Sequence, residues 1–448
     1  MDDDLLGICE RAVRIGEGLG ADEIEVFIAS RRSMDAGIEN NEIKMAKRTI
    51  SSAAGIRVFR KKSLGFASVN SFKPDKLEWA VKQAIALSKD APPDENNGLP
   101  SPKTLRPVTG LFDEGIAGMG EEEVLDRAKR MLAAACGVDT RVSIDGGKFE
   151  ATCGRRAIAN SLGVEGTEDF SSIYYDIGAH AVEGGNVSSI DYRFDGARSA
   201  EGDYSDSVAV ELAEAAVEAL TASKLESHVG SVIFSPLAAI EILISPILFS
   251  VDSSNVQKGV SRFKDKIGEK VAADIITITD DGNIPGGLSS SAFDREGVPH
   301  SPLGLIRNGE LAAFLHDTYT ARKAATDNNG HAGGSPMGVP SIDATNIRVS
   351  PGAEPLDRLV SSVRRGVLVQ RFSGRVDPVS GDFSGVAKAS KGIEGGSLQG
   401  AIRETLISGN VYDVLARVRG LSMETKRIMD FELPHFAVDD ISITGGSA

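Results

Sequence analysis

The sequence predicts an α+β protein, with an N-terminal domain of helices on antiparallel β-meanders and a C-terminal β-rich domain. Helical and strand-like segments alternate in runs, without the strict strand–helix–strand order of a parallel sheet. Glycine makes up 49 of 448 residues, well above the usual share of ~7%, which favours tight turns between strands. At roughly 100–200 residues per domain, the length suggests two or three domains. We place the main boundary near 225, with domains at 1–225 and 226–448.

The residue pattern of the N-terminal half predicts two units with a similar order of helices and strands. Apolar residues at helical spacing predict a helix over 4–19, alternation predicts strands, and a helix follows each run of strands. The predicted elements are a helix at 4–19, a strand at 23–29, two or three strands over 43–71, a helix at 74–87, a linker at 91–108, a helix at 121–135, strands at 141–150, 155–161 and 167–181, and a helix at 205–222. The recurring helix–meander–helix order suggests an internal duplication.

The C-terminal half has a different pattern, with short predicted strands and glycine-rich loops. A short apolar strand at 232–234 precedes Ser235 and Pro236, a typical helix start, and we expect that helix to run to about Ser245. Asn308-Gly309 is a strong hairpin signal within 303–314. Glycine-rich loops follow at 328–340 and 374–385, and the last predicted strand is 441–444.

Charge and composition exclude several classes of protein. The formal net charge is −15, whereas nucleic-acid binding needs a basic face, so we expect no nucleic-acid partner. Three scattered cysteines exclude a disulfide scaffold. The N-terminal stretch lacks the apolar core of a signal peptide, and the apolar stretch 232–251 contains Glu241 and two prolines, which disfavours a membrane span. We expect a cytoplasmic protein without a membrane association.

Common catalytic signatures are missing from the sequence. The spacing Gly16-x-Gly18-x-x-Ala21 follows a helix rather than a strand, so a helix stop explains it better than a dinucleotide site. No two of the six histidines lie within six residues of each other, so no single helix face can hold a metal ion with two imidazoles. A site assembled from distant histidines stays open, and His316 and His331 are its best candidates.

Eight separate stretches resemble the TldD/PmbA family, once described as modulators of DNA gyrase. They are 232–239 (VIFSPLAA), 266–271 (KIGEKV), 280–282 (DDG), 293–297 (FDREG), 305–311 (LIRNGEL), 329–332 (NGHA), 380–385 (SGDFSG) and 407–410 (ISGN). The resemblance implies one of two branches: TldD-like metalloproteases with an H-E-x-x-x-H helix and a later cysteine ligand, or PmbA/TldE-like chains without them. An ungapped match puts Ile244, Ser245 and Phe249 at the motif positions, and no cysteine follows Cys153. The chain therefore resembles the PmbA/TldE branch, and we expect Ile244 and Phe249 to be buried on that helix.

That branch implies a non-catalytic subunit of a TldD/TldE-type metalloprotease complex that processes or degrades peptides. We expect no catalytic residue, metal or cofactor in this chain, a TldD-like catalytic partner, peptide substrates, and a homodimer when the chain is alone. Asn329, His331, Gly333 and Asp382 are the candidate peptide-binding residues, because they lie in glycine-rich loops that a peptide backbone can approach. Two alternatives remain: a self-sufficient homodimeric metallopeptidase using His316 and His331, and an interaction protein that modulates a DNA topoisomerase.

Overall fold

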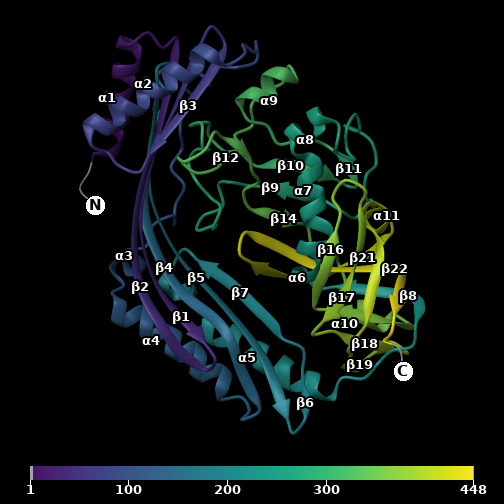
Figure 1. Ribbon diagram of the computed structural model, residues 1–448. Coiled ribbons are helices and arrows are strands. Elements are labelled where there is room, and N and C mark those ends of the chain that lie inside the picture. Colours follow the sequence, from purple (N-terminus) through teal and green to yellow (C-terminus); the bar gives the residue numbers. More distant parts are fainter. Residues whose placement is uncertain (1–3, 447–448) are drawn as a thin grey trace.

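The computed structural model describes residues 4–446 and contains two large sheets (Figure 1). The first is antiparallel, with the order β3-β2-β1-β4-β5-β6, and β7 also pairs with β5. Its strands are β1 (Glu23–Glu39), β2 (Glu42–Arg60), β3 (Ser63–Val69), β4 (Val142–Asn160), β5 (Glu165–Glu183), β6 (Asn186–Val187) and β7 (Asp191–Ala197). Its helices are α1 (Leu5–Gly18), α2 (Pro74–Asp90), α3 (Glu114–Gly118), α4 (Glu121–Cys136) and α5 (Ser205–Glu218). The predicted α+β class is confirmed.

The two faces of this sheet contact different parts of the protein. The even positions of β1 from Ile24 to Ile38 pack under helices: α1 and α2 cover one end of the sheet, and α4 and α5 cover the other. The odd positions Glu25 and Phe27 project to the opposite face, where they meet residues of the C-terminal half. Because successive side chains of a strand point to opposite faces, one strand builds both the helical core and a surface for the C-terminal domain.

The second sheet carries the C-terminal half. Its main path is β11-β10-β9-β14-β22-β8-β15-β18-β19, and β16, β17, β20 and β21 branch from it. The strands are β8 (His228–Phe234), β9 (Ile278–Asp280), β10 (Leu303–Arg307), β11 (Glu310–Leu311), β14 (Ile347–Val349), β15 (Arg365–Val369), β16 (Arg371–Val376), β17 (Asp382–Lys388), β18 (Lys391–Glu394), β19 (Ser397–Ala401), β20 (Leu406–Asn410), β21 (Val418–Ile428) and β22 (Phe431–Thr444), while β12 (Ala332–Gly333) pairs separately with β13 (Ser341–Ile342).

Short helices complete the C-terminal half. They are α6 (Pro236–Ala239), a π-helical turn (Ile240–Ile244), α7 (Ser245–Val251), α8 (Ser253–Lys258), α9 (Thr318–Lys323), α10 (Leu356–Ser361) and α11 (Val411–Ala416). The segment from α6 to α7 packs into the main hydrophobic core with β8 and β22. None of the helices described is long and apolar enough to cross a membrane.

Several predicted boundaries need correction. The strands expected at 141–150 and 155–161 are one strand, β4, because β1 and β5 pair with it along both edges. The strand expected at 441–444 is only the end of β22. The helix expected to stop near Ser245 continues to Val251, because the π-helical turn directly before α7 changes the hydrogen-bond pattern ahead of Pro246. The helix–strands–helix order does recur, on one shared sheet, while the duplication itself stays a prediction.

Candidate functional site

The helix that would carry a metalloprotease motif is part of the packed core. Ile244 has no exposed surface, and Ser245 is exposed, its hydroxyl donating to the Ile240 carbonyl at 2.9 Å. Phe249, which we expected to be buried, is only partly buried, and its carbonyl accepts a hydrogen bond from the Asn255 side chain. The expectation for Phe249 is therefore wrong: its side chain keeps some exposed surface and is not part of the main hydrophobic core.

These side chains do not fit a zinc ion. Isoleucine and phenylalanine offer no ligand atom, and serine replaces the carboxylate base. The carboxylate on the same helix is Glu241, and burial raises its pKa to about 7 against the opposing charge of Arg371. Within residues 4–446, no three His, Cys, Asp or Glu side chains form a group that could hold a metal ion.

The two histidines named as alternative ligands have other partners. His331 is only 2% exposed, and its ring nitrogens contact Asn329 Oδ1 at 2.9 Å and Asp280 Oδ1 at 3.0 Å. His316 Nε2 lies 3.1 Å from the Ser253 hydroxyl, and burial lowers the pKa of His316 to about 4. Both rings are held in the polar interior of the C-terminal half, where His331 connects the 328–334 loop to the end of β9.

The cavities whose walls best suit a ligand lie around Phe293, between the first sheet and the C-terminal loops. Three neighbouring cavities of about 330, 410 and 340 Å³ share wall residues there. The first and second share Glu168 and Phe293, the second and third share Ala292, and the first and third share His300. We call this group the Phe293 cavities. Together they combine aromatic rings, backbone and a few charged groups, as ligand sites usually do.

Two of the four predicted peptide-binding residues border these cavities. Gly333 lines the first cavity and Asn329 lines the third. His331 lies between them in sequence, but it is buried and holds the loop rather than facing a cavity. Asp382 begins β17 elsewhere in the fold, where it is exposed and accepts a hydrogen bond from Asn410 at 2.9 Å. The structure thus brings Asn329 and Gly333 together at one site and leaves Asp382 apart.

The first cavity also has walls that the sequence did not indicate as functional. Phe27 on β1, Arg156 on β4 and Glu168 and Phe170 on β5 all come from the face of the first sheet that is free of helices. Arg198 follows β7 and completes this wall. Strand alternation could have indicated this wall. Within 155–161, Arg156 and Ile158 share the strand face opposite the one that packs on helices.

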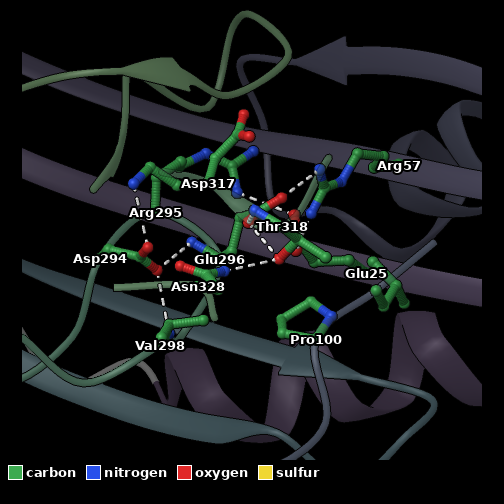
Figure 2. Close-up of polar contacts among 12 residues, drawn as sticks. Glu25, Arg57, Pro100, Asp294, Arg295, Glu296, Val298, Asp317, Thr318 and Asn328 are labelled. Atoms are coloured by element: carbon green, nitrogen blue, oxygen red, sulfur yellow. Dashed lines mark hydrogen bonds and ion pairs between the residues drawn. The ribbon is translucent and has the colours of Figure 1, made fainter. Parts of the chain in front are cut away.

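A buried network of charges fixes this wall against the C-terminal half (Figure 2). Arg57 Nη2 lies 2.6 Å from Glu25, and Arg57 Nη1 lies 2.6 Å from Glu296. Arg295 Nη1 contacts Glu25 at 2.9 Å, and its guanidinium lies 4.1 Å from the centre of the Phe27 ring. Two arginines and two glutamates balance each other, so these ion pairs hold the first cavity in shape.

Comparisons with known proteins agree with this architecture. Three family models match in order: PmbA/TldA metallopeptidase domain 1 at 24–88, the central domain at 114–223 and the C-terminal domain at 227–445. A metalloprotease PmbA homolog of Haemophilus influenzae is 26% identical over 444 residues, covering 97% of this chain and 94% of that protein. The metalloprotease PmbA of Escherichia coli O157:H7 is 23% identical over 433 residues, covering 95% and 93%. The crystal structure of TldE from Thermococcus kodakarensis superposes with a TM-score of 0.88 at 25% identity, covering 98% of this chain and 100% of that one.

Proposed function

Because this chain belongs to the PmbA/TldA metallopeptidase family, we propose that it is the non-catalytic subunit of a two-chain peptidase, which holds peptide for a TldD-like catalytic partner. The observation that carries the proposal is the helix from Pro236 to Val251, whose motif positions hold Ile244, Ser245 and Phe249. Zinc-dependent hydrolysis needs ligands for the ion and a base for the water, and the three motif positions of this helix offer neither.

The Phe293 cavities support a role in holding an extended peptide. They adjoin one another along the boundary between the two sheets, and the glycine-rich loop 330–334 borders them with little side-chain bulk. An extended peptide exposes backbone groups and alternating side chains, which suit a row of mixed polar and aromatic cavities. His331 and Asp280 fix this loop from behind, so the wall is formed before a peptide arrives.

Reconstitution with a TldD-like chain tests the subunit role. We expect no peptide cleavage by this chain alone and increased cleavage when both chains are mixed. Sedimentation should show a homodimer for the isolated chain and a heterodimer with the partner, with an interface of about 2,000 Å² or more in total, as is usual for obligate assemblies. A monomer that the partner leaves unchanged would remove the basis for the subunit role.

A pair of glycine variants tests the peptide-holding role. A Cβ at Gly333 would lie 2.4 Å from the Asp343 Cβ, whereas a Cβ at Gly338 on the same loop would meet nothing within 4 Å. In the two-chain complex, Gly333→Val should raise KM for several peptides and leave kcat unchanged, because the metal belongs to the partner. Gly338→Val is the matched control and should behave like wild type. Unchanged KM in both variants would mean that this loop does not touch the peptide.

A further inference from the structure

We propose that the first of the Phe293 cavities contains a carboxylate-binding subsite formed by Arg156 and Arg198. The inference rests on the proposed function, since it assigns to one cavity the negatively charged group of a bound peptide. It adds a ligand chemistry and two binding residues to that function.

Backbone carbonyls rather than an ion pair hold Arg198 within residues 4–446, and Glu168 attracts it without forming an ion pair. Its guanidinium donates to five backbone carbonyls, those of Leu111, Ser171, Gly287, Leu288 and Ser290, at 2.6–3.4 Å. No carboxylate in the described part of the chain forms an ion pair with it. Burial and the neighbouring charge of Arg156 lower the pKa of Arg198 to about 10, so it stays charged at neutral pH. A buried positive charge without an ion pair attracts an anion, because water screens it poorly.

All N–H groups of Arg198 are engaged, so the N–H donor for a ligand comes from Arg156. Its Nε and Nη2 donate to Glu168 Oε1 at 3.1 and 2.6 Å, and Nη2 also contacts the Ser291 hydroxyl. These bonds leave Nη1 for a ligand. The guanidinium carbon lies 5.3 Å from the centre of the Phe293 ring, so the ring fixes its plane. Since Glu168 cancels the charge of Arg156, the net positive charge at this end of the cavity is that of Arg198.

The other walls favour a singly charged organic acid over a phosphate. Phe27, Phe170 and Phe293 contribute aromatic surface to the cavity, which suits the side chain next to a peptide's carboxylate. Asp294 lies in the same wall, with its carboxylate accepting three backbone N–H bonds from Glu296, Val298 and Ala332. Burial and the neighbouring charge of Glu296 outweigh these bonds and raise the pKa of Asp294, which favours its neutral form. The single positive charge of Arg198 therefore matches a ligand group with one negative charge.

Calorimetry with three short peptides of one N-acetylated sequence tests the subsite on the full-length chain. The first ends in a free carboxylate, the second is its C-terminal amide, and the third is an amide with aspartate at its last position. We expect the free acid to bind about tenfold or more tightly than the neutral amide, as one hydrogen-bonded ion pair allows. The third peptide shows whether a side-chain carboxylate serves equally well.

The decisive variant is the double substitution Arg156→Gln with Glu168→Gln. It removes the guanidinium and leaves the net charge of the cavity unchanged, and the glutamine oxygen can still accept the Ala292 N–H that Glu168 accepts at 2.7 Å. Preference for the acid should fall to about threefold or less in this variant, because Arg198 keeps its charge but the hydrogen-bond donor of Arg156 is gone. Arg155→Gln, on the opposite face of β4, is the control and should keep the full preference. Arg198→Lys keeps the charge, and the donors of Arg198 bind backbone carbonyls rather than the ligand, so this variant should keep most of the preference.

The outcomes separate this inference from the function on which it rests. Equal affinity of the wild-type chain for acid and amide would overturn the carboxylate subsite and leave peptide holding intact. Full acid preference in the double variant would likewise overturn the role of Arg156. If none of the three peptides bound to the chain, either alone or in the two-chain complex, both the subsite and the peptide-holding function would fail.

Discussion

Arg57 and Glu296 lie 239 positions apart in the chain, yet Arg57 Nη1 is 2.6 Å from Glu296 Oε1. Arg57 lies on β2 of the first sheet. Glu296 lies on the loop that also carries Phe293, in the C-terminal half. Both side chains are almost fully buried, and Glu25 and Arg295 complete the charge balance. The position of the C-terminal loops on the first sheet therefore depends on this contact.

Arg57→Met should destabilise the protein by about 3–5 kcal/mol, because it leaves Glu296 buried without its ion pair. Guanidinium unfolding at neutral pH measures the loss. The matched control is Lys82→Met, which breaks the exposed Glu78–Lys82 pair on α2 and should cost about 0.3–0.5 kcal/mol at most. Similar costs for the two variants would show that the buried network does not hold the two halves together.

Ile244→Ala should cost about 2–5 kcal/mol, the usual range for removing a fully buried aliphatic side chain. Phe249→Ala should cost less than the ~3–5 kcal/mol of a core phenylalanine, since Phe249 is only partly buried. Denaturant unfolding of the two variants compares them directly. A larger loss for Phe249 than for Ile244 would contradict the packing described for this helix.

His300 should make the protein less stable in acid. Burial, with a smaller contribution from His331, lowers the pKa of His300 from 6.5 to about 3. Below pH 6.5 the unfolded chain therefore binds a proton at His300 that the folded chain does not, so stability falls as the pH decreases toward 3. The slope from one such histidine is up to about 1.4 kcal/mol per pH unit.

His300→Gln should flatten the stability curve in this acidic range by up to that slope, as measured by denaturant titrations at several pH values. Glu241 acts in the opposite sense: its folded pKa is raised from 4.5 to about 7, so its contribution is present below 4.5 and lost as the pH rises through 7. Glu241→Gln removes this opposing slope, so stability should fall more steeply with decreasing pH between 6.5 and 4.5 in that variant. An unchanged curve in His300→Gln would contradict a buried neutral imidazole.

Purified protein that has not met a chelator should contain less than one zinc per chain. The physical reason is the ligand set: His316 and His331 already contact Ser253, Asn329 and Asp280, and the motif helix presents hydrocarbon. Elemental analysis measures the metal content. Near-stoichiometric zinc that disappears in His316→Ala or His331→Ala would instead support the self-sufficient metallopeptidase.

The sequence by itself predicted the elements that local periodicity encodes. Residues 5–18, 74–90 and 121–136 form helices close to where helical spacing placed them, because one face of each helix repeats its apolar residues every turn. Alternation likewise located β5, although β4 was divided in two where Gly154 interrupts the pattern. The boundary near 225 stays a prediction, although the two sheets lie on either side of it.

Only the tertiary structure decided which residues share the candidate site. Phe27, Arg156 and Arg198 come from three strands or their ends, and nothing in their local sequence relates them to Gly333. His331 shows the converse: its glycine-rich surroundings suggested an exposed ligand-binding loop, but pairing with Asp280 buries it. Local patterns record which face of a strand or helix is apolar, whereas burial, ion pairing and cavity walls depend on contacts between segments far apart in the chain, and these form only when the two sheets pack together.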